Sequence, residues 1–430
     1  MMELRNYPEL SEKLFWHTLP NGLPIVVLPR PGFTRKLAYF VTDFGAIHRD
    51  FTLNGKSYAM PAGIAHYLEH KMFDMPDGDM FPKFAALGAT PNAFTSYDLT
   101  AYYSSCTDHF RENLQLLLEF VSTPYFTEES VQKEQGIIGQ EIGMNEDSPD
   151  GRLFENLAVA MYRDHPVQTP ILGTRESIAQ ITPELLTVCH RAFYRPGNML
   201  LCVIGDVDPD EVRQIALEVL PEKDDAVVQR VDSWQEEMTC PESKITRDME
   251  VAMPMFQLGF KHESPDKGEA AVLEEAIGDL AAEALFGESS RLYLRLYQEG
   301  LIDSSFGGGF ETVDGMALLV ASGDSEAPEK VRDAILEEAK RLVREGIDEK
   351  DFLRMKRSAL GRRIRDLDSF SSTIFRVCAY YFSEYDYFDF PEVYRKVEAE
   401  QLVEFLRRTV TEERCSLSII YPKEERYESQ

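Results

Sequence analysis

The segment His66-Tyr-Leu-Glu69-His70 places the strongest constraint on the fold of this chain. Side chains four residues apart lie on one face of an α-helix, so His66 and His70 can point two imidazoles at one position. Glu69 lies on the same turn, and its carboxylate can reach a water molecule at that position without being a ligand. Imidazole suits zinc, and catalytic zinc sites combine three protein ligands with an open fourth position. The segment therefore predicts a helix that carries two zinc ligands and a general base.

A second helix, predicted to begin after Thr127, supplies candidates for the third ligand. Thr127 is a good N-cap, and a carboxylate is the usual ligand beside two histidines. Glu134 and Glu141 lie about two turns apart, so they share one face of this helix. Three glycines also recur there at helical spacing: Gly136, Gly139 and Gly143. Because each glycine costs about 1 kcal/mol relative to alanine inside a helix, we expect the backbone of the His66 helix to pack closely against them.

Together, the two segments resemble the zinc-site pattern of the insulinase/pitrilysin peptidases, whose His-x-x-Glu-His order is that of the inverzincins. That family includes the zinc-bearing subunit of mitochondrial processing peptidase and many small bacterial members. The resemblance implies one Zn²⁺ per chain, held by His66, His70 and Glu141. It also implies that Glu69 is the catalytic base. Glu134 would contact a zinc ligand rather than the metal and so orient the site.

Further segments extend this resemblance over nearly the whole chain. Residues 92–98 match the family's edge strand, to which an extended substrate adds as a further strand. The resemblance implies a substrate-binding strand formed by Asn92, Ala93, Phe94 and Thr95. Residues 193–201 and 203–209 match the strand that closes the first half, and residues 286–293 and 300–302 match a marker of the second half.

Alternating and β-branched or aromatic residues predict the strands, and apolar periodicity predicts the helices. Strands are predicted near residues 22–28, 37–43, 90–96, 100–105, 199–205, 256–260, 305–311, 316–322 and 416–421. Beyond the two helices of the motif, helices are predicted near residues 80–87, 108–121, 268–284, 291–297, 327–344 and 349–367. The order of elements in the first half recurs in the second half.

This pattern predicts an α+β fold of two homologous domains, residues 1–222 and 246–430, joined by a linker at 223–245. Each domain is expected to be an antiparallel-rich sheet covered by helices on one face. In the second half, the helix near Leu273 corresponds to the His66 helix and contains no histidine. The C-terminal domain therefore lacks metal ligands, and the two domains together would form half of a peptidase chamber.

Composition excludes several classes of function. The chain has 430 residues, a net charge of −29 and a pI near 4.7, so nucleic acid is not an expected partner. No run of about 18 apolar residues occurs, and no membrane span is expected. The first residues show neither a secretion signal nor an import leader, and the six cysteines are scattered without a Cys-x-x-Cys pair. We therefore expect a bacterial cytoplasmic protein with reduced thiols.

The second half departs from the family at one functional point. Active members carry an Arg and a Tyr around the Gly-Leu marker, and this pair holds the substrate carbonyl and the developing oxyanion. Alignment on Gly300-Leu301 places Leu296 and Asp303 at these positions, and a shift by one residue pairs Arg295 with Ile302. In members built from two unlike subunits, one chain carries zinc and the other supplies Arg and Tyr. The resemblance thus implies a zinc endopeptidase for small unstructured peptides that works as a heterodimer with a homologous partner.

Three alternatives stay open. The first is a self-sufficient homodimer in which Arg291, Arg295 or a nearby tyrosine replaces the missing pair. The second is a non-catalytic peptide-binding scaffold, against which the intact Glu69 argues. The third is a structural zinc site with four protein ligands, which ranks lowest because no further Cys or His has suitable spacing. The peptide, its cleavage site, the partner and the pathway do not follow from a family resemblance.

Overall fold

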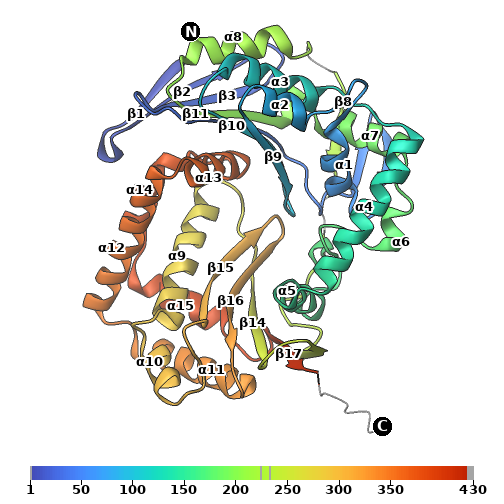
Figure 1. The fold of residues 1–430 in the computed structure, drawn as a ribbon. Coiled ribbons are helices and arrows are strands. Elements are labelled where there is room, and N and C mark those ends of the chain that lie inside the picture. The colour runs from blue at the N-terminus through green and yellow to red at the C-terminus, as the bar shows by residue number, and fades with distance from the viewer. Residues whose placement is uncertain (1, 223–224, 232–233, 424–430) are drawn as a thin grey trace, which may run out of the picture.

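The computed structural model describes residues 2–222, 225–231 and 234–423. Residues 223–224 and 232–233 of the predicted linker, and residues 1 and 424–430 of the predicted domains, lie outside the described residues. Two large sheets dominate the fold, one in each half of the chain, with helices around both (Figure 1). The α+β class and the two similar halves predicted from the sequence are confirmed.

The first sheet has seven strands in the order β1-β2-β3-β11-β4-β10-β9. Their bounds are β1 Glu3–Tyr7, β2 Glu12–Thr18, β3 Pro24–Pro29, β4 Lys36–Thr42, β9 Thr90–Thr95, β10 Thr100–Cys106 and β11 Met199–Gly205. Neighbouring strands are antiparallel except β3 and β11. β11 is buried along its whole length, which agrees with its continuous apolar sequence. β9 forms one edge of this sheet.

The second sheet has five strands in the order β13-β17-β14-β16-β15. Their bounds are β13 Lys244–Met249, β14 Met255–His262, β15 Gly307–Val313, β16 Met316–Asp324 and β17 Cys415–Pro422. β13 and β17 are parallel, and the other neighbouring pairs are antiparallel. This order repeats that of β3-β11-β4-β10-β9, so the edge strand β15 corresponds to the edge strand β9.

Shorter strands form two small sheets that are separate from the large ones. β5 (Asp50–Leu53) pairs with β6 (Lys56–Ala59) and with β12 (Val228–Arg230), and β7 (Asp74–Met75) pairs with β8 (Gly78–Asp79). Because β12 lies inside the predicted linker, the described part of this segment is partly held as a strand against the first half.

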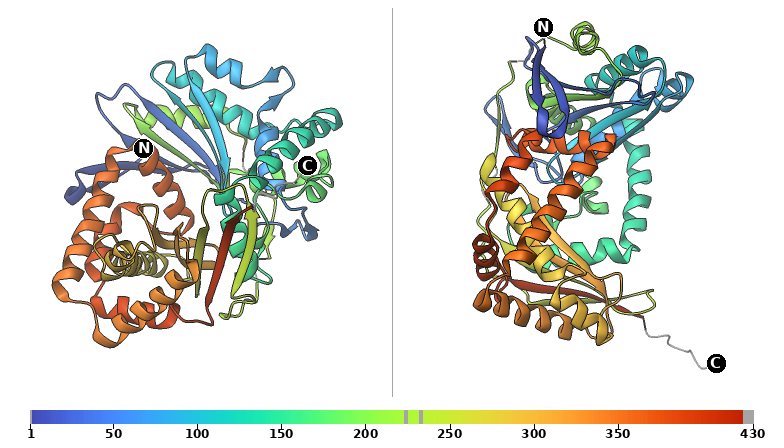
Figure 2. Two further views of the ribbon diagram at one scale, coloured as in Figure 1. Left: turned by 60° about the horizontal axis from the view of Figure 1, so that its bottom comes forward. Right: turned by 90° about the vertical axis from the view of Figure 1, so that its left-hand side faces the viewer.

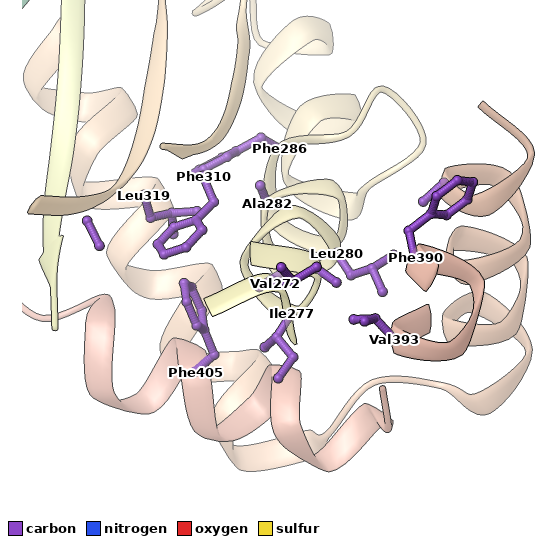
Figure 3. Packing of buried hydrophobic residues seen from close by; sticks show 14 of the residues in the cluster. Val272, Ile277, Leu280, Ala282, Phe286, Phe310, Leu319, Phe390, Val393 and Phe405 are labelled. Atoms are coloured by element: carbon purple, nitrogen blue, oxygen red, sulfur yellow. The ribbon is translucent and has the colours of Figure 1, made fainter. Parts of the chain in front are cut away.

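Helices cover one face of each sheet, as the sequence predicts. α3 (Phe110–Ser122) and α8 (Pro209–Val219) lie against the first sheet, and α9 (Glu269–Phe286), α11 (Pro328–Glu345) and α15 (Ala399–Thr409) lie against the second. The remaining helices around them are α1 Ile64–Met72, α2 Phe81–Ala86, α4 Glu128–Glu146, α6 Arg175–Ile178, α7 Pro183–Phe193, α10 Arg291–Gln298, α12 Glu349–Arg365 and α14 Phe390–Lys396. Figure 3 shows α9 side chains such as Val272 and Leu280 among Phe310, Phe390 and Phe405 in the core of the second half.

The other face of each sheet is covered by a helix from the opposite half. α5 (Pro149–Met161) packs on β14 and β17 of the second sheet, and α13 (Phe370–Phe382) packs on β11 and β4 of the first. Figures 1 and 2 show α13 beneath the first sheet and α5 beside the second. The approach is close, because a Cβ added to Gly259 on β14 would lie 2.6 Å from Sδ of Met161. The sequence predicts helices on one face of each sheet only. In the structure, α5 and α13 each cover the second face of the sheet in the opposite half.

In the part of the chain that the structure describes, no helix has the length and the apolar character needed to cross a bilayer.

Candidate metal centre

The motif helix α1 is almost wholly buried and has a fixed starting point. Gly63 precedes it with a φ of +87°, a left-handed conformation that favours glycine. A Cβ at Gly63 would also lie 2.4 Å from the carbonyl oxygen of Leu172, so the chain can begin the helix here only with glycine. The buried residues of α1 include His66, Tyr67, Leu68 and Glu69. The local sequence thus sets both the helix and the direction in which its motif faces.

Helix α4 lies beside α1 and is anchored at its start. Thr127 caps it, as the sequence predicts: its side-chain oxygen accepts a hydrogen bond from the backbone N–H of Ser130, and its own backbone N–H donates to the Ser130 hydroxyl. The hydroxyl of Tyr67 donates to the carbonyl oxygen of Val131, which joins the two helices. The face of α4 that carries Glu134 and Glu141 is therefore held against the motif.

The predicted role of the α4 glycines is wrong. No atom lies within 4 Å of a Cβ built on Gly136 or Gly139, and at Gly143 the nearest atom is the guanidinium of Arg175 at 3.1 Å. The buried residues of α4 are instead Val131, Ile138 and Ile142. Gly136 and Gly139 face open space, and Gly143 faces the side chain of Arg175 rather than another backbone.

His66, His70 and Glu141 come together at one point. Nε2 of His66 lies 3.7 Å from Oε1 of Glu141, and Nε2 of His70 lies 3.6 Å from Oε2. One potential ligand atom from each residue lies within 4.8 Å of the other two, and among the described residues this is the single His/Cys/Asp/Glu group of that kind. The structure therefore brings together the three residues that the motif and the family resemblance predict as zinc ligands.

This donor set fits a zinc ion. Burial, followed by the proximity of His70, lowers the pKa of His66 to about 3, so its imidazole is neutral and free to act as a ligand at neutral pH. Two imidazole nitrogens and one carboxylate form a three-ligand set of the catalytic type. The side chain of Glu141 is 42% exposed, so the cluster can be reached from solvent.

Glu134 bonds to the far side of the His70 ring. Its Oε1 lies 2.9 Å from Nδ1 of His70, while Nε2 of the same ring faces Glu141. Burial alone would lower the pKa of His70, but the hydrogen bond to Glu134 and the nearby carboxylates outweigh it and raise that pKa. A proton held on Nδ1 leaves the lone pair of Nε2 for a metal.

Glu69 has the environment of a general base. It is 7% exposed, and Oγ1 of Thr95 donates to its Oε2 at 2.7 Å. Burial raises the pKa of Glu69, and the Thr95 hydroxyl and His70 oppose this rise in part. A carboxylate with a raised pKa accepts and releases protons more readily near neutral pH.

The predicted substrate strand is the edge strand β9, whose free side is not paired within the described residues. Asn92 is exposed, and its side-chain oxygen accepts a hydrogen bond from the backbone N–H of Ala93. Phe94 faces the second half, and its ring lies 5.9 Å from that of Phe375 on α13. The Thr95 side chain instead bonds to Glu69, a contact that the sequence does not predict because it depends on how the strand lies against α1.

The positions that align with the family's Arg/Tyr pair hold neither an arginine nor a tyrosine. Leu296 is fully buried, and Asp303 accepts a hydrogen bond from the backbone of Ser305. Arg295 forms an ion pair with Glu337 at 3.3 Å. These residues lie on or after α10, at the end of the molecule away from α1 (Figure 1).

Comparison with known proteins places this architecture in a family. The family model described as Insulinase (Peptidase family M16) matches residues 55–175, and the model described as Peptidase M16 inactive domain matches residues 180–359. A Bacillus subtilis protein named "Uncharacterized zinc protease YmfH" is 36% identical over 431 residues, which cover 98% of this chain and 100% of that protein. The chain belongs to the insulinase family, M16.

Solved structures of other proteins share the fold. A protein from Alicyclobacillus acidocaldarius, titled "putative M16-like peptidase", is 32% identical and superimposes with a TM-score of 0.92, covering 98% of this chain and 99% of that one. A protease from Helicobacter pylori, 19% identical, has a TM-score of 0.80 over 96% of this chain and 100% of its own, which shows the fold alone. Within the M16 family, the peptidase model falls on the half with the His/His/Glu cluster, and the inactive-domain model covers most of the other half.

Proposed function

We propose that this chain is a zinc metalloendopeptidase that hydrolyses peptide bonds in small unstructured peptides. The observation that carries the proposal is the combination of a three-ligand cluster with a buried glutamate beside it. A structural zinc site does not need a base, so the position of Glu69 favours catalysis over a scaffold role. The names of related proteins, which are called zinc proteases, support the same conclusion.

His66, His70 and Glu141 would hold the metal, with the His70 ring kept in place by Glu134. Bound zinc supplies a Lewis acid that polarises a peptide carbonyl and lowers the pKa of water. Glu69 takes a proton from the attacking water as the new C–O bond forms, and it returns a proton to the amine nitrogen as the C–N bond breaks. Its burial keeps this proton from bulk solvent.

The substrate would lie extended along β9. The free edge of this strand offers backbone donors and acceptors from Asn92 to Thr95, so added strands pair through main-chain hydrogen bonds that are indifferent to sequence. The N–H of Ala93, now bonded to the side chain of Asn92, is one donor that a bound peptide can use. Only peptides without stable structure can adopt the required extended form.

A homologous partner subunit is proposed to complete the site. Leu296 and Asp303 cannot supply the oxyanion contacts, and Arg295 is engaged by Glu337. A partner that brings an Arg and a Tyr would provide this electrostatic stabilisation, which is commonly large. In the alternative of a homodimer, Arg291 or a nearby tyrosine of a second copy would have to serve instead.

We also propose a bacterial cytoplasmic location. All six cysteines lie in the described part of the chain and are free, and five of them are buried. Free thiols of this number are usual in reducing compartments. Fractionation of cells that produce the protein tests this: recovery with periplasmic or secreted markers would contradict it.

The deciding experiment is peptide cleavage by the purified protein, followed by mass spectrometry on mixed unstructured peptides, with zinc content measured in parallel. Glu69→Gln should retain about one zinc per chain and lose cleavage by at least about 100-fold, the usual contribution of a general base. The matched control is Glu128→Gln, an exposed glutamate in the first turn of α4, which should behave as the wild type. Equal rates for Glu69→Gln and wild type would remove Glu69 from the mechanism.

The same assay separates the forms of assembly. Activity of the chain alone, lost in Glu69→Gln, indicates a self-sufficient homodimer. Bound zinc without cleavage, with activity appearing when a homologous chain that carries the Arg/Tyr pair is added, indicates a heterodimer. Bound peptide without cleavage under both conditions would favour the scaffold.

A further inference from the structure

Thr95 makes the single hydrogen bond that the structure gives to the side chain of Glu69 within the described residues. Its Oγ1 donates to Oε2 of Glu69 at 2.7 Å. Thr95 lies on β9, in register with Thr100 on β10. The Thr100 hydroxyl is 3.4 Å from that of Thr95 and donates to the carbonyl oxygen of Phe44 at 2.8 Å. The hydroxyl proton of Thr100 is therefore donated to Phe44, and the hydroxyl proton of Thr95 is donated to Glu69.

This hydrogen bond distinguishes the two oxygens of the carboxylate. A buried carboxylate without a donor is costly, and a hydroxyl donor to a charged oxygen is one of the stronger neutral-to-charged hydrogen bonds. Since the Thr95 proton occupies Oε2, that oxygen is the poorer acceptor for a second proton. The other oxygen, Oε1, receives no hydrogen bond from the described residues.

We propose that Thr95 is a positioning residue for Glu69, fixing the carboxylate so that Oε1 alone takes and returns the proton. This inference rests on the proposed peptidase function. During attack, an O–H bond of water breaks, its proton goes to Oε1 and the new C–O bond forms. The same proton then passes to the amine nitrogen while the C–N bond breaks. Oε2 stays bonded to Thr95 in both steps, so the carboxylate does not rotate between them.

The strand β9 would then have two separate functions, one carried by its backbone and one by the Thr95 side chain. The backbone edge of the strand is free to pair with substrate, whereas the Thr95 side chain points to the sheet face on which α1 lies. Removal of the hydroxyl therefore leaves the substrate-binding edge intact. This separation predicts an effect on kcat rather than on KM, which distinguishes positioning from substrate binding.

The test compares Thr95→Val, which keeps the shape and removes the donor, with Thr95→Ser, which keeps the donor and removes a methyl group. The control is Thr107→Val, an exposed threonine directly after β10 and outside the substrate-binding strand. We expect Thr95→Val to lower kcat by about 10- to 100-fold, with KM within about twofold and zinc content unchanged. Thr95→Ser should recover most of the kcat, and Thr107→Val should match the wild type.

Crystal structures of the zinc-loaded wild type and Thr95→Val provide a readout that does not depend on activity. We expect one carboxylate orientation at Glu69 in the wild type and a rotated or divided carboxylate in Thr95→Val. The proposal is overturned by a wild-type kcat in Thr95→Val, by a raised KM with kcat unchanged, or by equal losses of kcat and thermal stability in both Thr95 variants. If the wild type cleaves no better than Glu69→Gln, the peptidase function fails, and the two crystal structures still decide whether Thr95 orients Glu69.

Discussion

The carboxylate of Glu134 lies 2.9 Å from Nδ1 of His70 and thereby directs the opposite nitrogen of that ring toward Glu141. The first prediction follows from this pair. Glu134→Gln should weaken zinc binding by about 10- to 100-fold, because partners behind a ligand histidine set its orientation and basicity. Competition with a chromogenic chelator measures this, with Glu129→Gln, exposed in the first turn of α4, as the control. Zinc affinity equal to the control would show that Glu134 does not support His70.

A buried ion pair holds the end of α5 to the second half. Lys261 is 1% exposed, and its Nζ donates to Glu236 at 2.8 Å and to the carbonyl oxygens of Met161 and Glu237. Lys261→Met leaves the Glu236 carboxylate without its cation, so we expect a loss of about 3 kcal/mol in the free energy of unfolding.

Denaturant unfolding measures the effect of Lys261→Met, and Lys267→Met serves as the control because Lys267 is 40% exposed. That control should change the free energy of unfolding by less than about 1 kcal/mol. Similar losses in both variants would argue against a special contribution from the buried pair.

Two glycines should respond in opposite directions to alanine. Gly136 lies inside α4 with open space around it, so Gly136→Ala should raise the free energy of unfolding by about 1 kcal/mol. Gly259→Ala would place a Cβ 2.6 Å from Sδ of the buried Met161, and a loss of about 1–3 kcal/mol is expected. Thermal or denaturant unfolding measures the change in the free energy of unfolding for both variants. A loss at Gly136 would indicate a contact that forms in solution at that face, for example with a partner.

The pH dependence of stability should carry a contribution from Asp279 on α9. Burial, then the charge of Glu275, raises the pKa of Asp279 to about 7, although Arg363 and Arg376 oppose this. The folded state therefore holds a proton that the unfolded chain loses near pH 4, so this group lowers stability as the pH rises from about 4 to 7. Asp279→Asn should melt higher than wild type at pH 8, with the difference shrinking toward pH 4. A difference that is constant across this range would contradict the raised pKa.

Local patterns in the sequence predict most elements of this fold. The strand expected at 199–205 is found as Met199–Gly205, and the helix expected to begin after Thr127 is found as Glu128–Glu146. Periodicity and capping are short-range signals, and these segments carry them strongly. The cluster of His66, His70 and Glu141 is predictable for a related reason, because helical spacing places the two histidines on one face and the family resemblance points to Glu141.

The remaining features depend on contacts between distant segments. The helices predicted from the sequence include neither α5 nor α13. An apolar helix face can show that a helix is buried, but not which sheet it covers, so the packing of each of these helices on the sheet of the opposite half is not predicted. The spacing of the α4 glycines suggests a closely packed backbone, but the structure places nothing beside Gly136 and Gly139 and only the Arg175 side chain beside Gly143. The bond from Thr95 to Glu69 depends on the register of β9 and on the position of α1, neither of which a local pattern determines.

The reciprocal placement of α5 and α13 makes the two halves dependent on each other for solubility. A gene divided at the segment between them would yield an N-terminal fragment with one apolar sheet face bare, and a C-terminal fragment with the same defect. Large bare apolar faces drive association or aggregation. The fragments should therefore fold only when they are produced together, and the intact chain should unfold in a single transition rather than half by half.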